Sequence, residues 1–290
     1  MGYLWALLGV VCIGCYMLPV RFSTTKGFSF FCFMGLGMLP IVVLRWNSIE
    51  LLWAYPMWLG AALLSGLLWG IGQIAANLAL EEISLAKAAV YFNSNTLLNI
   101  LLGLVFFHEA TSFNSTLLLL MGAVLLTAGA IWVTKIPALS SKEGNLKKGI
   151  FFSLLAGFFW GIYFFPITWM RHSDTQTSIG QMDVLIGLAL GGAIVAIAVS
   201  FFEKTKKTSP LDWALGFGSA VLWVVGMSGM LMAIQLLGLS RAVPMVNANT
   251  LVYTAWSLFY FKELPLAQWP KVLGSVLLAL AGGILMALSN

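Results

Sequence analysis

A group of polar side chains lies in the middle of an apolar stretch of the sequence. The segment "AAVYFNSNTLLNILLGLVFF" carries Asn93, Asn95, Thr96 and Asn99 among aliphatic and aromatic residues. Amides and hydroxyls can bind the polar groups of a small ligand, but they can also join neighbouring helices by hydrogen bonds. On a continuous helix, Asn95 and Asn99 share one face and Asn93 and Thr96 share another. We therefore expect one face to border a cavity and the other to contact a helix.

The same pattern occurs a second time, 154 residues later, in "NANTLVY". There Asn249 and Tyr253 share one helical face, and Asn247 and Thr250 share the other. Two copies of one polar pattern in apolar surroundings favour a shared ligand site over isolated helix contacts. The first-choice candidates for ligand contact are Asn95, Asn99, Asn249 and Tyr253, and the second-choice candidates are Asn93, Thr96, Asn247 and Thr250.

Aromatic residues inside the apolar segments extend this candidate site. Trp69, Trp160 and Trp223 lie well inside their segments, whereas Trp and Tyr at membrane interfaces belong near segment ends. Such rings can stack on the apolar face of a sugar or hold a quaternary amine by cation–π contacts. The other candidates at similar depth are Tyr16, Gln73 and Tyr163, with Asn77 as a second choice.

The elements that must position these residues are transmembrane helices. Of 290 residues, 60 % are hydrophobic and only 9 % are charged, and the mean hydropathy is +0.96; an ordinary soluble domain has about 25 % charged residues. Apolar runs long enough to cross a bilayer as helices recur along the chain. The sequence predicts an all-α integral membrane protein with ten transmembrane helices, near residues 3–20, 27–44, 57–79, 86–107, 116–134, 149–170, 180–202, 211–236, 242–261 and 269–288.

The distribution of basic residues predicts the orientation. Of the 15 Lys and Arg residues, 12 fall in the odd-numbered loops or at the segment ends that border them. Because positive charge is retained in the cytoplasm, we expect both termini outside, in a plasma (inner) membrane. The basic residues are scattered over short membrane-edge loops, which argues against a nucleic-acid partner. The first apolar run lacks a basic region before it, so we expect no cleavable signal peptide.

The sequence contains an internal repeat. The shift of 154 residues also pairs Trp69 with Trp223 and Lys87 with Arg241, and a shift of 147 residues pairs Pro19 with Pro166. We predict two five-helix repeats, 1–134 and 149–290, joined by a basic cytoplasmic linker at 135–148. Five is odd, so the second copy crosses the membrane in the opposite sense, and inverted repeats of this kind are typical of secondary transporters. Pro19 and Pro166 are expected to act as hinges.

Enzymatic and metal-binding interpretations find little support in the residues. Cys12 and Cys15 form a CxxC within a helix, and "FFHEATS" lacks the second His of a zinc-binding HExxH. We expect no metal, no cofactor and no catalytic residues. Titratable side chains cluster at segment ends, which leaves coupling to protons undemonstrated and favours an uncharged substrate.

Several stretches together resemble the drug/metabolite transporter superfamily, and within it the glucose/ribose porter branch. They are "LLWGIGQ" at 67–73, "ISLAKAAV" at 83–90, "FFHE" at 106–109 with "YFKE" at 260–263, and "LGSVLLALAGGILM" at 273–286. The resemblance implies ten helices in two inverted repeats. It also implies a central site on the first, third, fourth, sixth, eighth and ninth helices, which here carry Tyr16, Trp69, Gln73, Asn95, Trp160, Trp223 and Asn249.

The sequence departs from this resemblance in two respects. Sugar porters of the branch do not carry the paired NxNT motif, and many relatives have cytoplasmic termini. We expect a carrier that moves a small polar metabolite across the bilayer by alternating access, with sugar uptake as the first hypothesis. The alternative is a carrier or exporter of choline-like amines, amino acids or drugs. We expect a monomer or a weak homodimer.

Overall fold

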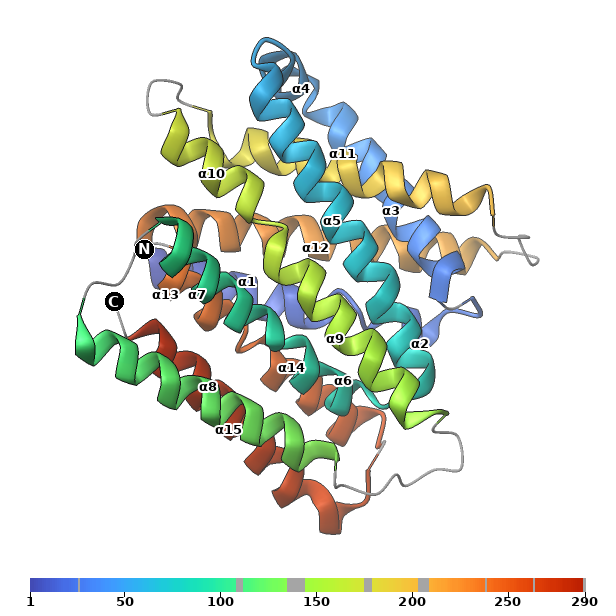
Figure 1. Ribbon diagram of the computed structural model, residues 1–290. Coiled ribbons are helices and arrows are strands. Elements are labelled where there is room, and N and C mark those ends of the chain that lie inside the picture. Colours follow the sequence, from blue (N-terminus) through green and yellow to red (C-terminus); the bar gives the residue numbers. More distant parts are fainter. Residues whose placement is uncertain are drawn as a thin grey trace.

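The fold was analysed in a computed structural model that describes residues 1–25, 27–107, 112–134, 144–174, 179–202, 209–237, 239–262 and 264–288. Every regular element in these residues is a helix, as expected from the sequence (Figure 1). The predicted segment ends at His108–Glu109 and Glu263, and residues 135–143 of the predicted linker, lie outside the described residues.

Helical segments long and apolar enough to cross a bilayer make this a multi-pass membrane protein. Within the described residues there are seven: Gly2–Phe22, Pro56–Glu82, Lys87–Phe107, Leu146–Ser173, Gln181–Ser200, Pro210–Leu237 and Leu266–Leu285. An eighth is formed if Ser29–Leu44 and Trp46–Trp53, which are bent by 81° relative to each other, are counted as one span.

Four of the predicted spans are not continuous helices. Residues 3–20 form α1 (Gly2–Cys15) and α2 (Pro19–Phe22), and 86–107 form α6 (Leu85–Phe92) and α7 (Ser94–Phe107). Residues 149–170 fall in α9 (Leu146–Ile162) and α10 (Phe165–Ser173). Residues 242–261 fall in α13 (Leu239–Val246), α14 (Asn249–Ala255) and the π-helix η1 (Trp256–Tyr260).

The remaining helices are α3 (Gly27–Leu44), α4 (Trp46–Trp53), α5 (Pro56–Glu82), α8 (Phe113–Thr134), α11 (Gln181–Ser200), α12 (Pro210–Leu237), α15 (Trp269–Ala287) and the 3-10 turn η2 (Leu266–Gln268).

The breaks have local physical causes. Pro19 is the first residue of α2 and Pro166 the second residue of α10, and in the first turn of a helix the missing N–H of proline is tolerated. Each proline starts a new helix because it cannot continue the preceding one. The carbonyl groups released at the α1 break are satisfied by other helices: the hydroxyl of Tyr253 donates to the Ile13 carbonyl at 2.6 Å, and that of Ser219 donates to the Tyr16 carbonyl at 2.7 Å. A broken helix inside a membrane is stable only when such partners exist.

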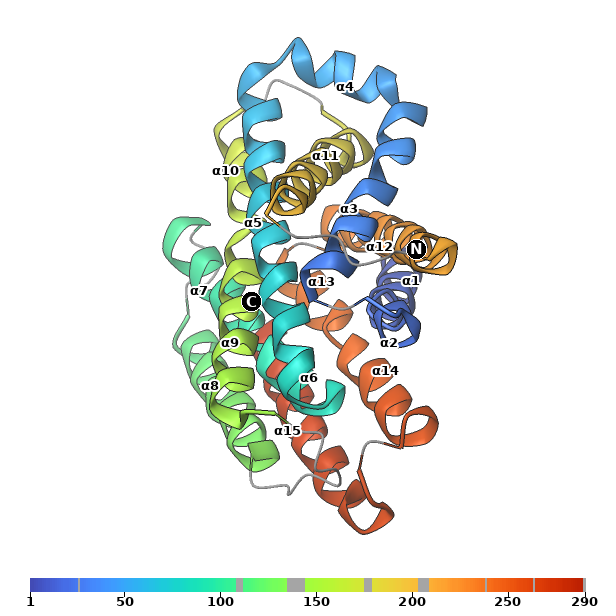
Figure 2. The same ribbon diagram turned by 90° about the vertical axis from the view of Figure 1, so that its right-hand side faces the viewer.

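Small residues allow the closest helix contacts. In the bundle of α5, α9 and α11, Gly66 of α5 faces Gly191 of α11 so closely that a Cβ at Gly191 would lie 2.8 Å from the Cα of Gly66. The sequence contains Gly187 and Gly191 in a GxxxG pattern, which is typical of such contacts. Helices α8 and α15 pack together along the lower edge of the bundle (Figures 1 and 2).

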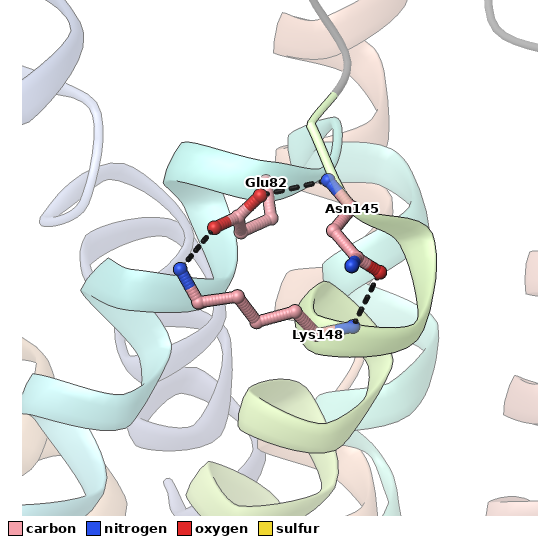
Figure 3. Close-up of polar contacts among 3 residues, drawn as sticks. All are labelled: Glu82, Asn145 and Lys148. Carbon is pink, nitrogen blue, oxygen red and sulfur yellow. Dashed lines mark hydrogen bonds and ion pairs between the residues drawn. The ribbon is translucent and has the colours of Figure 1, made fainter.

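An exposed polar network connects the end of α5 to the start of α9 (Figure 3). The carboxylate of Glu82 accepts a hydrogen bond from the backbone N–H of Asn145 at 2.8 Å and forms an ion pair with Lys148 at 2.5 Å. The side chain of Asn145 caps α9 by accepting from the backbone N–H of Lys148 at 3.2 Å. Because ion pairs exposed to solvent contribute little to stability, we interpret this network mainly as fixing where α9 begins.

Candidate functional site

The helix breaks surround a small central cavity of about 50 Å³. The lining comes from α1, α5, α6, α7, α9, α12, α13 and α14 and from the breaks between them. Its residues are Ile13, Tyr16, Trp69, Ala89, Phe92, Asn93, Asn95, Trp160, Tyr163, Trp223, Met227, Met230, Val246, Asn247, Asn249 and Tyr253.

One wall of the cavity is aromatic. Trp69 of α5 and Trp223 of α12, which the repeat pairs, are nearly fully buried, with ring centroids 4.3 Å apart and planes inclined at 40°. Trp160, Tyr163 and Tyr16 add further rings. None of the described lining residues is Asp, Glu, Lys, Arg or His, so the wall offers π-faces and no formal charge.

Another wall carries the amides of both NxNT motifs. The side-chain amide of Asn247 donates to the hydroxyl of Thr96 at 2.5 Å, and the hydroxyl of Thr250 donates to the amide oxygen of Asn93 at 3.0 Å. The repeat pairs Asn93 with Asn247 and Thr96 with Thr250. The Asn of each motif is therefore hydrogen-bonded to the Thr of the other motif, and the two bonds join repeat-equivalent pairs of residues. These four second-choice candidates therefore join α6 and α7 to α13 and α14.

The two remaining amides of the motifs differ from each other. Asn95 accepts a hydrogen bond from Asn247 at 3.0 Å, and its backbone carbonyl accepts another from the side chain of Asn99 at 2.9 Å. Asn249 also lines the cavity and is only partly buried, but its side chain forms no hydrogen bond with any described residue. Asn249 is therefore the amide whose donor and acceptor groups are both available to a ligand.

Several candidates lie behind the cavity wall and not in it. Gln73 accepts a hydrogen bond from the hydroxyl of Tyr16 at 2.7 Å and donates to Asn77 at 3.1 Å, so both amides support Tyr16 from behind. Asn99 is also buried outside the lining. Tyr253 lines the cavity, but its hydroxyl donates a hydrogen bond to the Ile13 carbonyl. The breaks do not separate the predicted pairs: Asn95 and Asn99 lie one turn apart on α7, and Asn249 and Tyr253 lie one turn apart on α14. What differs from the expectation is the partner of each polar group, because Asn99 donates to the Asn95 carbonyl and Tyr253 to the Ile13 carbonyl.

Sequence reasoning did not include the apolar part of the lining, which comprises Ile13, Ala89, Phe92, Met227, Met230 and Val246. Such residues are common in every membrane helix, so only proximity to Asn93 and Asn247 along the chain could have suggested Phe92 and Val246. No group of three or more His, Cys, Asp or Glu residues that could hold a metal ion occurs in the described part of the chain.

A multi-pass helical bundle whose broken helices meet at an internal cavity has the architecture of a membrane transport protein. Comparison with protein families agrees: the profile of the EamA-like transporter family matches residues 147–288. The resemblance to the drug/metabolite transporter superfamily, in which this family lies, is thus confirmed by the match over residues 147–288, and the matched family is one of transporters and not of enzymes.

Individual relatives are distant. The chain is 21 % identical over 235 residues, or 78 % of each chain, to a Bacillus cereus protein named "Putative sugar uptake protein". It is 32 % identical over 107 residues to the "Probable glucose uptake protein GlcU" of Priestia megaterium, covering 37 % of this chain and 34 % of that protein. It is 26 % identical over 150 residues to "Transmembrane protein 144 homolog B" of Dictyostelium discoideum, covering 50 % of this chain and 42 % of that protein.

A solved crystal structure shares the fold. Its TM-score is 0.60 at 15 % sequence identity, and the alignment covers 99 % of this chain and 97 % of the other. At this identity the likeness concerns the fold alone.

Proposed function

We propose that the protein is a secondary transporter that takes up a small uncharged sugar by alternating access. The observation that carries this proposal is the cavity that Trp69 and Trp223 line together with the free amide of Asn249, with no charged side chain in the described lining. A sugar ring has apolar C–H faces that stack on indoles and hydroxyls that hydrogen-bond to amides. The names of distant relatives, which refer to sugar and glucose uptake, support the same substrate class.

We further propose that the chain forms ten transmembrane helices in two inverted five-helix repeats, residues 1–134 and 149–290, joined by a linker. Support comes from the repeated motifs and from the matching positions of the breaks. The first break begins at Tyr16, and its counterpart in the second repeat begins at Tyr163. The second break lies at Asn93, and its counterpart begins at Asn247. In this proposal both termini lie outside, the protein acts in the plasma membrane as a monomer or weak homodimer, and Pro19 and Pro166 serve as hinges.

A carrier of a quaternary amine is the second candidate, because several aromatic rings border the same cavity and could hold a cation without a carboxylate. The two candidates differ in what the amides contribute, since a quaternary ammonium group donates no hydrogen bond and choline has a single hydroxyl, whereas a sugar has several. Loss of the Asn249 amide should therefore weaken sugar transport more than choline transport.

The experiment is flux into proteoliposomes that contain the purified protein, with labelled D-glucose, D-ribose, L-rhamnose and choline as probes. Empty liposomes and a Trp69→Ala/Trp223→Ala variant serve as controls. Saturable flux of one of the sugars, lost in the double variant, is the expected result. Saturable flux of choline with none of any sugar would contradict the sugar proposal and support the second candidate.

A further inference from the structure

The amide network at the centre of the cavity is asymmetric, although the residues that form it are related by the repeat. Asn247 uses its side-chain N–H groups twice, towards Thr96 and towards Asn95. The equivalent residue, Asn93, accepts from Thr250 and donates from its amide nitrogen to no described residue. Consequently Asn95 is held by a neighbour, whereas its counterpart Asn249 is not.

The unused groups are complementary to each other. The Asn93 amide nitrogen has two hydrogens available, and the Asn249 amide oxygen is an unoccupied acceptor on the opposite motif. A bond from Asn93 to Asn249 would be the repeat-related equivalent of the existing bond from Asn247 to Asn95. Both arrangements keep the two crossed threonine bonds and contain one amide–amide bond.

Building on the proposed transport by alternating access, we propose that these two amide bonds replace each other during the transport cycle. In the conformation described here Asn247 holds Asn95, and Asn249 is the amide that binds the substrate. In the conformation open to the opposite side, Asn93 holds Asn249, and Asn95 is the amide that binds the substrate.

Physical chemistry makes this exchange suitable for a carrier. The halves of an inverted repeat exchange their conformations when the site changes sides, so a contact made by one repeat is replaced by its equivalent in the other. One neutral hydrogen bond is exchanged for another of the same type, and the free energies of the two states therefore stay close. A carrier needs two states of similar free energy to cycle. The exchange also supplies one unoccupied amide to the substrate from either side.

The test measures the KM for D-glucose separately from each face, in vesicles of defined orientation. Asn249→Ala should raise the KM about five- to tenfold from one face and less from the other, and Asn95→Ala should show the opposite pattern, because each variant loses its hydrogen bond to the substrate in one conformation only. Asn47→Ala, which removes an exposed amide of α4, is the matched control and should leave both values unchanged. Equal increases from both faces in Asn95→Ala and in Asn249→Ala would overturn the exchange while leaving the transport function intact.

Cross-linking tests the exchange without any substrate. In a background with Cys12, Cys15 and Cys32 changed to Ala, the pairs Asn95→Cys/Asn247→Cys and Asn93→Cys/Asn249→Cys are oxidised in separate proteins. We expect both pairs to form disulfides. If only the first pair forms a disulfide, the second amide bond does not occur and the exchange is wrong. Absence of flux of D-glucose, D-ribose and L-rhamnose in the unmodified protein would instead contradict the choice of substrate in the proposed function.

Discussion

Thr96 and Asn247, 151 residues apart in the sequence, are joined by a hydrogen bond of 2.5 Å between the first and second NxNT motifs. The equivalent residues Thr250 and Asn93 are joined by a bond of 3.0 Å. All four side chains are at least nine-tenths buried. These contacts hold the two broken helices against each other beside the cavity, so these four side chains contribute to helix cohesion.

The crossed bonds should be detectable as energetic coupling. Thr96→Val, which keeps the shape and removes the hydroxyl, should lower stability by about 0.6–1.7 kcal/mol, the range found for hydrogen bonds between membrane helices. The same change in an Asn247→Ala background should cost clearly less, because its partner is already missing. Thermal unfolding of the four proteins in detergent measures this coupling. Additive losses would show that the two side chains do not interact.

The tryptophan pair should determine substrate affinity. Trp69→Ala and Trp223→Ala each remove an indole from the cavity wall, and we expect the affinity for a transported sugar to fall at least about tenfold, because aromatic contacts dominate such sites. Quenching of intrinsic fluorescence by D-glucose measures the binding. Trp132→Ala, on α8, 41 % exposed and outside the cavity lining, is the matched control and should bind as the unmodified protein does. Unchanged affinity in both cavity variants would place the substrate elsewhere.

Asp212 should be a structural residue at the edge of the bundle. It is fully buried and accepts five hydrogen bonds: from the Ser23 hydroxyl, from the backbone N–H and hydroxyl of Thr24, and from the backbone N–H and hydroxyl of Ser209. Asp212→Ala leaves these donors without their acceptor, so we expect a loss of at least about 2 kcal/mol and a lower thermal midpoint.

The control for this change is Asp183→Ala, which removes an acceptor for the single side-chain hydrogen bond from Ser48 at 2.7 Å. Its thermal midpoint should fall less than that of Asp212→Ala. An equal or larger decrease for Asp183→Ala would show that the number of bonds to Asp212 does not determine its contribution.

The contact of α5 with α11 should not tolerate a side chain. A methyl group at Gly66 would collide with the carbonyl oxygen of Leu188, so Gly66→Ala should separate the helices and reduce the yield of monodisperse protein. Gly60, on the same helix, has open space at the corresponding position, and Gly60→Ala should be neutral or slightly stabilising. Size-exclusion profiles of the two variants measure the difference. Equal profiles would show that α11 can move aside.

Much of the fold could be predicted from hydrophobicity and spacing. The apolar runs predicted where helical segments lie, because a backbone in hydrocarbon must satisfy its own hydrogen bonds. The short helix α4 was missed, because its eight residues mix polar and apolar side chains below the length of a span. The breaks at Asn93 and Asn247 were also missed, because neither residue is a proline and the apolar runs on both sides of each polar motif together have the length of one span.

For the candidate site, the sequence by itself determined which residue types meet: paired amides, threonines and tryptophans, identified by their repetition in both halves. The tertiary structure alone decided which of these side chains are hydrogen-bonded to other helices and which face the cavity. Gln73 and Asn77 support Tyr16. The side chains that join helices are Asn93, Thr96, Asn247 and Thr250. Asn249 lines the cavity and forms no hydrogen bond with any described residue. The physical reason is that a hydrogen-bond partner from another helix determines whether a buried amide is occupied, and residue spacing within one helix does not specify that partner.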